Sequence, residues 1–373
     1  MLFPYAFIPD HPIYKLQQWI DELFLNVWCT ANPTVEYSID LLPSDLKELT
    51  LEIYNDDRIK TDYFYGPIER VYKLFQGFDQ TTKDILSKAY RDNNAIEDLC
   101  KGSNGCNPYF YSMLSALNQP LKVEIENYCK SLFKSVIHLK SVQKRIGMID
   151  DHYKEFVTIN DKRKCPFCGL NSIIGPNRTV RDAYDHYLPK DIYPFNSINF
   201  KNLSPMCHEC NSSHKMGKDP ITHPHTQARR KAFYPYDTCG SYDISIEINF
   251  HHTDISNLTE HDISLILNSP THQEEVDTWK DIFGIEERYK EKCASKTDGW
   301  YWYCQATDEY ENAKVRLGGQ FTQEAWVQMQ ISAANSNEYS EYSAENFLKA
   351  KYLEACMAQH VFGKESSVHL EET

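Results

Sequence analysis

Apolar side chains in the first half of the chain recur every three or four positions, which places them on one face of a helix. The clearest stripe runs over residues 13–27, and further stripes follow over residues 46–53, 68–75 and 121–139. This pattern predicts a helical N-terminal domain over residues 1–158. The stripes contain no chemistry that we can name, so we interpret this domain as one for packing or docking.

The pattern changes after residue 236. Residues 242–250 alternate almost perfectly between polar and apolar side chains, which predicts a half-buried strand. The apolar stretch 263–267 is a candidate partner strand. Helical spacing returns over residues 276–283 and 347–356. We therefore expect residues 236–373 to form a mostly helical region that starts with a strand.

The segment between these regions, residues 159–235, has little regular periodicity and is dense in Pro, Asn, His and Arg. At 373 residues the chain exceeds the usual size of a single core, so two or three packed units are expected. We treat 159–235 as a central module of its own. The expected fold class is α+β and mostly helical, with this module between two helical regions.

Composition places the protein in a reducing compartment. No stretch approaches the roughly 20 apolar residues that cross a bilayer, so no membrane association is expected. The first residues lack a basic region followed by an apolar run, so they do not resemble a signal peptide. The twelve cysteines show no framework spacing, which is typical of reduced thiols in the cytoplasm.

The formal net charge of −14 argues against a polyanionic partner at first sight. The distribution of the charges changes that conclusion. Residues 161–235 hold twelve Lys or Arg against six Asp or Glu, so the acidic excess lies elsewhere in the chain. A basic segment within an acidic chain fits phosphate binding confined to one surface. It also indicates weak overall affinity for DNA and a partner that delivers the substrate.

Two Cys-x-x-Cys pairs lie within the basic segment. Cys165 and Cys168 form the first pair, and Cys207 and Cys210 form the second. Two such pairs predict a structural zinc site in which four thiolates close the coordination shell. The alternative, four unrelated buried cysteines, is the less favoured interpretation. We interpret the other eight cysteines as small packed side chains, and disulfide pairing among them is the less favoured alternative.

Polar residues with catalytic potential lie between and after the two pairs. Asp185 is a hard oxygen donor suited to Mg²⁺ or Mn²⁺, and His186 suits a general base near neutral pH. Asn202 can hold the loop after His186, and Asn211 can offer a carbonyl oxygen to the same cation as Asp185. His214 is a further candidate ligand, although solvation is the alternative. Adjacent strand residues face opposite sides, so Asp185 and His186 share a site only if the strand ends there.

Basic side chains flank these residues and are candidates for contacts with nucleic-acid phosphates. The alternative is a solvated surface without a ligand. The candidates are Lys190, Lys215, Lys218, Arg229 and Arg230.

Taken together, the cysteine pairs, Asp185-His186-x-x-Pro189, Asn202 and Asn211 resemble the HNH endonuclease family with an embedded zinc ribbon, the ββα-metal fold. The resemblance covers at most a fifth of the chain. It implies that His186 is the general base and that Asp185 and Asn211 bind one catalytic cation. It further implies that Asn202 orients the loop and that the cysteines hold zinc.

The resemblance also implies a setting. Similar zinc-ribbon HNH proteins occur in bacterial mobile-element and antiphage defence loci, some with ATPase partners, so a defence effector is expected. The expected substrate is DNA, although the sequence does not distinguish DNA from RNA. Two alternatives stay open: a non-catalytic zinc module that binds nucleic acid or protein, and a nuclease that is silent until its partner binds.

Overall fold

The computed structural model describes residues 1–57, 59, 62–239, 242–319, 321–336 and 342–362. This described part is mostly helical and contains two short antiparallel sheets of two strands each. The prediction of a mostly helical α+β fold is confirmed at this level. Among the described residues, no helix combines the length and the apolar character that crossing a membrane requires.

The described chain divides into two compact units. The N-terminal unit contains residues 3–163 and 173–239, and the C-terminal unit contains Lys164–Ser172 and residues 242–362. The sequence predicted a separate module over 159–235. Most of that module belongs to the same unit as the N-terminal helices, whereas Lys164–Ser172 belongs to the C-terminal unit.

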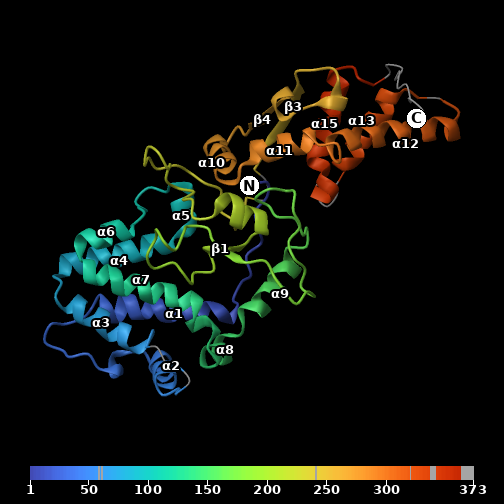
Figure 1. The fold of residues 1–373 in the computed structure, drawn as a ribbon. Helices are drawn as coiled ribbons and strands as arrows, with labels where there is room; N and C mark the ends of the chain where they lie inside the picture. The colour runs from blue at the N-terminus through green and yellow to red at the C-terminus, as the bar shows by residue number, and fades with distance from the viewer. Residues whose placement is uncertain (58, 60–61, 240–241, 320, 337–341, 363–373) are drawn as a thin grey trace. The chain divides into compact units, whose positions relative to one another are not determined.

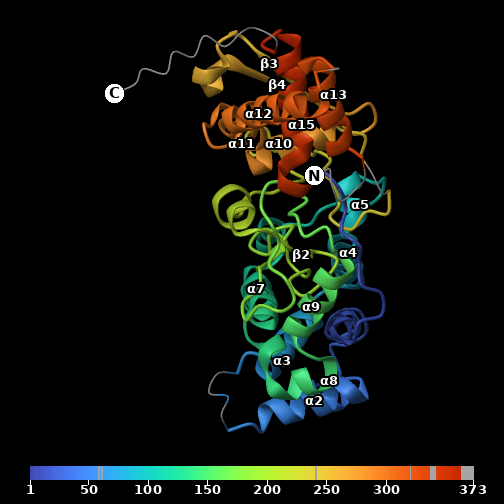
Figure 2. The ribbon, with the colours of Figure 1, turned by 90° about the vertical axis from the view of Figure 1, so that its right-hand side faces the viewer.

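Helices make up most of the N-terminal unit, as the blue to green ribbon in Figures 1 and 2 shows. The helical spacing of residues 13–27 is realised as α1 and the π-helical turn η2, which bury the predicted apolar face. The bounds are α1 (Lys15–Glu22), η2 (Leu23–Trp28), α2 (Ser44–Tyr54), α3 (Tyr65–Gln76), α4 (Gln80–Asn94), α5 (Ile96–Lys101), α6 (Tyr111–Leu117), α7 (Gln119–Lys134), α8 (Lys140–Ile146) and α9 (Ile149–Ile159).

Side chains at helix starts explain where several of these helices begin. The Asp79 carboxylate accepts a hydrogen bond from Thr82 N at 2.8 Å at the start of α4. The Asn118 amide oxygen accepts one from Leu121 N at 2.8 Å at the start of α7. Each satisfies a backbone N–H that has no partner within its helix. Pro120 lies in the first turn of α7, where its missing N–H costs nothing.

An aromatic core holds the N-terminal helices together. Phe24 of η2 stacks on Tyr90 of α4, with the ring centroids 4.2 Å apart. Trp28 packs edge to face on Tyr128 of α7, at 5.7 Å. These rings are almost fully buried, and large buried aromatics contribute much of the hydrophobic free energy of folding. This core supports α7, which contributes to the candidate site.

A strand–strand–helix segment follows α9 in the same unit. β1 (Tyr184–His186) pairs antiparallel with β2 (Leu203–Pro205), so that His186 lies opposite Leu203. The helical segment η5 (Cys210–Lys215) comes four residues after β2. Both strands are buried throughout. β1 ends at His186, as the sequence required for Asp185 and His186 to share one site.

The C-terminal unit pairs a hairpin with helices. β3 (Ser245–Phe250) and β4 (Ile263–Asn268) are antiparallel, so the predicted strand and its predicted partner are confirmed. Gly318, at φ +71°, ends α12. The helices are α10 (Gln273–Phe283), α11 (Ile285–Ala294), α12 (Gly299–Leu317), α13 (Gln323–Ala334) and α15 (Asn346–Ala358).

Short helical turns join several of these elements. They are η1 (Pro12–Tyr14), η3 (Ile39–Leu41), η4 (Val136–His138), η6 (Ile255–Asn257), η7 (Glu260–Asp262) and η8 (Ser343–Glu345).

Nine of the twelve cysteines are buried. Outside the two Cys-x-x-Cys pairs, Cys100, Cys129 and Cys293 lie in apolar packing. Burial raises the pKa of the Cys129 thiol to about 12, so it stays protonated and unreactive near neutral pH. The prediction of packed cysteines thus holds for the buried ones, whereas Cys106 and Cys304 are only partly buried and Cys239 is exposed.

Candidate metal centre and active site

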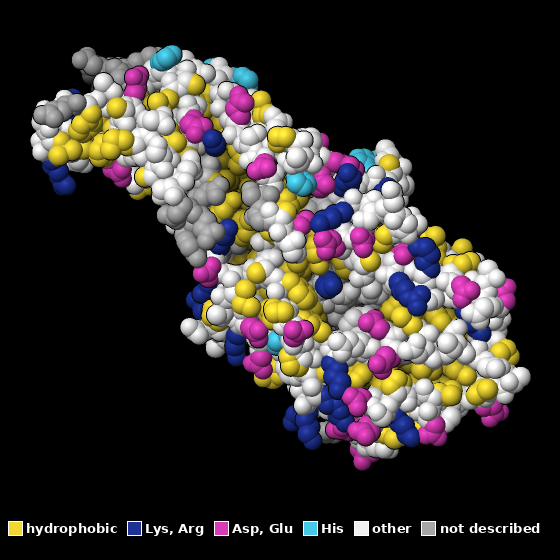
Figure 3. Space-filling model, turned by 180° about the vertical axis from the view of Figure 1, so that it is seen from behind, with side chains coloured by type: hydrophobic (Ala, Val, Ile, Leu, Met, Phe, Trp, Pro, Cys, Tyr) yellow, Lys and Arg dark blue, Asp and Glu magenta, His cyan; other side chains and the backbone are white. Residues whose placement is uncertain are grey.

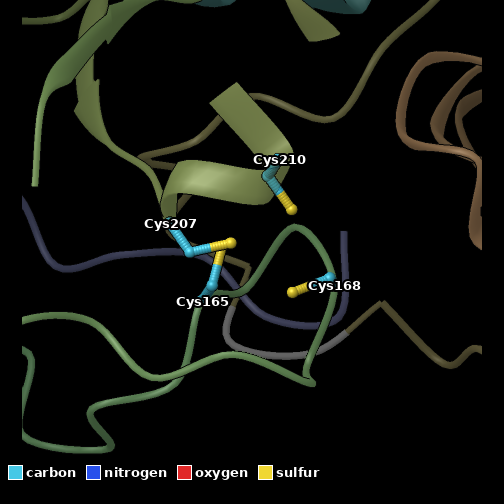
Figure 4. A group of neighbouring side chains, drawn as sticks. All are labelled: Cys165, Cys168, Cys207 and Cys210. Atoms are coloured by element: carbon cyan, nitrogen blue, oxygen red, sulfur yellow. The ribbon is translucent and has the colours of Figure 1, made fainter. Parts of the chain in front are cut away.

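The four cysteines of the two pairs come together, and their side chains point toward one another in Figure 4. Their sulfur atoms all lie within 4.8 Å of one another, and all four residues are buried. Four thiolates at this spacing suit a closed tetrahedral zinc shell. Among the described residues, no other group of three or more His, Cys, Asp or Glu gathers its ligand atoms in this way. The cluster can therefore hold a zinc-type ion.

A tight turn shapes the first cysteine pair. Gly169 N donates to the Cys165 carbonyl at 2.7 Å, and Cys165 N donates to the Asn171 carbonyl at 2.8 Å. Asn171 N lies 3.5 Å from the Cys168 sulfur, to which it donates. Gly169 adopts φ +69°, a conformation that side chains rarely accept. An amide that donates to sulfur stabilises the thiolate form that binds metal.

Helices α10 and α11 anchor the same turn within the C-terminal unit. The Trp279 indole N–H donates to the Phe167 carbonyl at 2.7 Å. The Tyr289 hydroxyl donates to the Cys168 carbonyl at 2.8 Å. Both acceptors lie inside or beside the Cys-x-x-Cys pair, so these bonds fix the backbone that presents the two sulfurs.

The second cysteine pair starts a helical segment. Asn211 N donates to the Cys207 carbonyl at 3.0 Å, and Met216 N donates to the Asn211 carbonyl at 2.9 Å. The second bond spans five residues, so η5 is wound as a π-helix. Single π-turns are rare in proteins overall, but those that occur often lie at functional sites. This turn carries Cys210, Asn211 and Lys215 on one short element.

His186 lies at the end of β1 with its imidazole buried. Its Nε2 lies 2.8 Å from the carbonyl oxygen of Ser197. A carbonyl only accepts, so Nε2 carries the hydrogen and Nδ1 keeps the lone pair of a neutral ring. Burial lowers the pKa of His186 from 6.5 to about 3, so the ring is neutral near pH 7. The Phe133 ring of α7 packs edge to face against it at 4.6 Å.

Asn202 fastens the loop that follows His186. Its side-chain oxygen accepts from Leu188 N at 2.8 Å, and its side-chain nitrogen donates to the Leu188 carbonyl at 2.9 Å. Its own carbonyl accepts from Tyr187 N at 2.9 Å. Asn202 is fully buried, so these bonds form without competition from water. Asn202 thus holds the loop after His186 through its side-chain amide, as its position in the sequence indicated.

Asp185 has an intramolecular cation as its partner. Its Oδ2 lies 2.8 Å from the Nζ of Lys215, and the Lys215 side chain is fully buried. The same ammonium donates to the His186 carbonyl at 3.0 Å. In this arrangement Lys215 does not present its charge to solvent, where the sequence analysis expected it to meet phosphate.

The other expected cation ligands lie on η5. Within the described residues, the Asn211 amide makes no side-chain hydrogen bond to Asp185 or His186. The His214 imidazole lies 3.6 Å from the Glu209 carboxylate and is about one-fifth exposed. Among the described residues, the contact found for the Asp185 carboxylate is with the Lys215 ammonium, so the cation site expected at Asp185 and Asn211 stays a prediction.

Of the remaining basic candidates, the two lysines are at least partly exposed to solvent, whereas the two arginines bind backbone carbonyls of the fold. Lys218 is exposed, and Lys190 is partly exposed and pairs with Asp191 at 3.2 Å. Arg229 donates to the Ile221 and Leu99 carbonyls, and Arg230 donates to the Asp219 carbonyl at 3.1 Å. Basic and acidic side chains are interspersed on the face shown in Figure 3.

Two residues that hold His186 were not predicted from the sequence. Ser197 acts through its backbone carbonyl, for which any residue type would serve, so its identity gives no signal. In the sequence, Phe133 is one more apolar residue of a helical stripe, and nothing distinguishes it from the others. Only the packing of α7 against the loop after β1 reveals either role.

Comparisons of this chain with protein-family models, with curated proteins and with solved structures found no match.

Proposed function

We propose that this chain is an HNH-type endonuclease that hydrolyses DNA phosphodiester bonds. The observation that carries the proposal is the state of His186: a neutral imidazole at the end of β1, with Nε2 bound to a carbonyl and Nδ1 left as an acceptor. The order strand, strand, cysteine pair and helix supports it, because this is the order that the resemblance implies. The four-cysteine cluster supports it in the same way.

In the proposed reaction, Nδ1 of His186 accepts a proton from water, and the oxygen of that water attacks phosphorus. The bond from phosphorus to the 3′-oxygen breaks in line, and the departing oxygen takes up a proton from solvent, which yields 5′-phosphate and 3′-hydroxyl ends. Ser197 keeps Nε2 protonated, so the basic nitrogen is always Nδ1. Asn202 holds the loop that positions the imidazole. A positioned general base typically contributes about 10²–10⁴-fold to the rate.

The metals enter this proposal differently. Zn²⁺ in the closed cysteine shell would stabilise the fold around η5 and would offer no position to a substrate. Binding of Mg²⁺ or Mn²⁺ by Asp185 and Asn211 remains a prediction, because the Asp185 carboxylate is paired with the Lys215 ammonium in this structure. We therefore assign the proton transfer to His186 and assign no step to that cation.

The cytoplasmic setting, the defence role and an ATPase partner stay predictions drawn from the composition and the resemblance. They bear on when the enzyme would act and not on the chemistry of the site.

A second candidate function is a non-catalytic zinc module that binds nucleic acid or protein. The burial of Asp185 and His186, 7% and 8% exposed, favours it, because both side chains also have structural partners. This alternative predicts DNA binding without turnover. It also predicts that replacing His186 leaves binding intact and changes nothing else.

The test is cleavage of supercoiled plasmid by the zinc-loaded full chain, with Mg²⁺ or Mn²⁺ added. The proposal expects nicked or linear products with 5′-phosphate ends, and at least a 100-fold lower rate for His186→Asn. Gel-shift binding by both proteins without cleavage by either supports the non-catalytic module. Cleavage by His186→Asn at the rate of the unsubstituted chain would rule out His186 as the base.

A further inference from the structure

A cavity of about 360 Å³ lies within the N-terminal unit. Its lining comes from the segment before η1, from η1 and α1, from the end of α4, and from the loop that precedes β2. None of the described residues that line it belongs to the metal centre or to the candidate active site. Its volume falls in the range of roughly 300–1,000 Å³ that small-molecule sites occupy.

Three aromatic rings contribute to the lining of this cavity. Phe7 stacks on Tyr14, with the ring centroids 5.2 Å apart and the ring planes at 17°. Phe200 packs at a tilt against Tyr14, at 5.6 Å. The Tyr14 hydroxyl donates to the Ile8 carbonyl at 2.8 Å, which fixes the central ring. Phe7 and Tyr14 are partly exposed, so a planar ligand can stack in this cavity on rings that are already in place.

A carboxylate lies in the same lining. Asp21 follows Gln17 by four residues on α1, so the two side chains share one face of the helix. Asp21 Oδ1 accepts from the Gln17 amide at 2.7 Å and from the Tyr90 hydroxyl at 2.6 Å. Its other oxygen, Oδ2, has no hydrogen-bond or ion-pair partner among the described residues. A partly buried carboxylate oxygen in a cavity is suited to a ligand that donates hydrogen bonds.

A lysine supplies positive charge at the cavity. Lys201 is exposed, and its ammonium forms no ion pair with a described residue. Its backbone N–H donates to Asn199 Oδ1 at 3.0 Å, and Asn199 Nδ2 donates to the Asn94 carbonyl at 3.1 Å. These bonds hold the loop that carries Lys201 against the end of α4. An accessible ammonium on a fixed backbone suits a phosphate group.

The acceptor at Asp21 discriminates among the common nucleic-acid bases. A carboxylate only accepts hydrogen bonds. Guanine carries its N1–H and its N2 amino group side by side, so one edge of this base offers two adjacent donors. Adenine and cytosine place an acceptor nitrogen next to their amino group, and uracil and thymine flank their N–H with carbonyl oxygens. Those four bases therefore bring an acceptor toward the carboxylate, and guanine does not.

We propose that this cavity binds a guanine base that carries a phosphate. The base stacks within the aromatic lining of Phe7, Tyr14 and Phe200. Its donor edge meets Oδ2 of Asp21, and the phosphate meets Lys201. A free guanine nucleotide and a guanine within a nucleic-acid strand share this chemistry. The inference goes beyond the proposed function, because binding at this cavity requires no cleavage.

The loop of the cavity also contacts His186. The Ser197 carbonyl accepts from His186 Nε2 at 2.8 Å, and Asn199 of the cavity lining follows two residues later. A ligand in the cavity should therefore stabilise the loop that holds the imidazole. We expect a saturating ligand to slow amide hydrogen exchange over residues 197–203, and unchanged exchange there would contradict the proposed site.

The first experiment measures nucleotide binding to the zinc-loaded full chain by calorimetry, with no divalent cation added. We expect GMP to bind at least tenfold more tightly than AMP. Asp21→Asn should lower the affinity for GMP at least tenfold, because an amide nitrogen at the position of Oδ2 is a donor that faces the donors of guanine. The matched control is Glu22→Gln, which removes an exposed carboxylate from the next position of α1 and should leave GMP affinity unchanged.

A change of specificity separates recognition by Asp21 from a structural role. XMP has a carbonyl oxygen where GMP has the N2 amino group, so it offers an acceptor to the amide nitrogen of Asp21→Asn. We expect this variant to bind XMP more tightly than GMP and the unsubstituted chain to show the opposite order. The same order in both proteins would overturn the contact with Asp21.

A surface variant keeps the proposal testable if Asp21→Asn fails to fold. Lys201→Met alters an exposed side chain, so it should not disturb the fold. We expect it to lower the affinity for GMP at least fivefold and to leave the affinity for guanosine, which has no phosphate, unchanged. Unchanged GMP affinity in Lys201→Met would contradict the proposal.

A last comparison distinguishes the two sources of guanine. Its probes are GMP and a short thymine strand with one central guanine, and the control strand carries adenine at that position. Tighter binding of GMP supports a free nucleotide, whereas tighter binding of the guanine strand supports a base of the nucleic acid. Equal binding of GMP and AMP, or no binding of either guanine probe, would overturn the proposal. A chain that binds GMP but never cleaves plasmid would retain this site and lose the endonuclease.

Discussion

Two buried histidines of the N-terminal unit show how differently the same side chain can be used. His152 of α9 has both ring nitrogens within hydrogen-bond distance of tyrosine hydroxyls, Tyr14 and Tyr184. His186 has one nitrogen on the Ser197 carbonyl, and its other nitrogen makes no hydrogen bond within the described residues. Burial lowers the pKa of both imidazoles to about 3. A low pKa therefore does not distinguish the two, whereas the unused acceptor does.

The surroundings of the two histidines differ as well. Ring side chains pack around His152, with Phe200, Tyr184 and His11 among them. His186 lies beside a buried ion pair, because Lys215 contacts both the Asp185 carboxylate and the His186 carbonyl. We expect the first region to serve stability, and the second to depend on charge and on the metal that the four cysteines can hold. Three experiments test this contrast.

The largest effect should follow loss of the zinc-type ion. Cys207→Ser removes one of four ligands, and structural zinc sites contribute on the order of 10 kcal/mol to folding in small domains. We expect about one zinc per chain in the unsubstituted protein and none in the variant, measured by elemental analysis. Hydrogen exchange should accelerate over residues 203–216 and much less in α9. Cys129→Ser, a buried cysteine outside the cluster, should retain the zinc.

The next effect separates the two histidines by activity. His186→Asn should lower plasmid cleavage by at least 100-fold, which corresponds to about 2.7 kcal/mol of barrier. His152→Asn should lower the melting temperature but leave cleavage within about threefold, because that ring has no free acceptor to lose. Similar losses of activity in both variants at a temperature where both are folded would erase the distinction.

The smallest effect is expected in the loss of folding stability at acidic pH. The pKa of folded His152 lies below that of an unfolded histidine, chiefly because burial disfavours the charged ring. Between pH 6.5 and 3 the unfolded chain therefore binds the proton more readily, so stability falls as the pH falls through this window.

Replacing His152 with Asn removes this linkage. From pH 6.5 to 4.5 the variant should lose about 2–3 kcal/mol less stability than the unsubstituted chain, at about 1.4 kcal/mol for each pKa unit. Urea unfolding at the two pH values measures the difference. Equal losses would show that His152 is not the residue that senses acid here.

Local patterns predicted much of this fold from the sequence. The helical stripes and the alternation over residues 242–250 depend on neighbours in the chain, so they appear as expected in α1, α7 and β3. β1 and β2 have three residues each and are buried on both faces, so they show no alternation. Only the Asp185–His186 motif and the cysteine pairs pointed to them.

The sequence predicted which residues belong to the candidate site, but it did not predict the contacts that these residues make. The four cysteines come together as predicted, because two Cys-x-x-Cys pairs are typical of residues that bind one shared metal ion. Lysine is almost never fully buried, so the sequence analysis placed Lys215 in solvent. The fold buries it because Asp185, in a separate strand, supplies the opposite charge. Such pairings follow from tertiary structure, and a single sequence does not reveal them.

Gly169 has a consequence for recognising relatives of this chain. It adopts φ +69°, and a Cβ atom there would collide with the side chains of Leu2 and Phe347. Alanine at this position would have to adopt a strained backbone and displace the ends of two side chains. We therefore expect relatives that keep this turn to favour glycine directly after the first Cys-x-x-Cys pair.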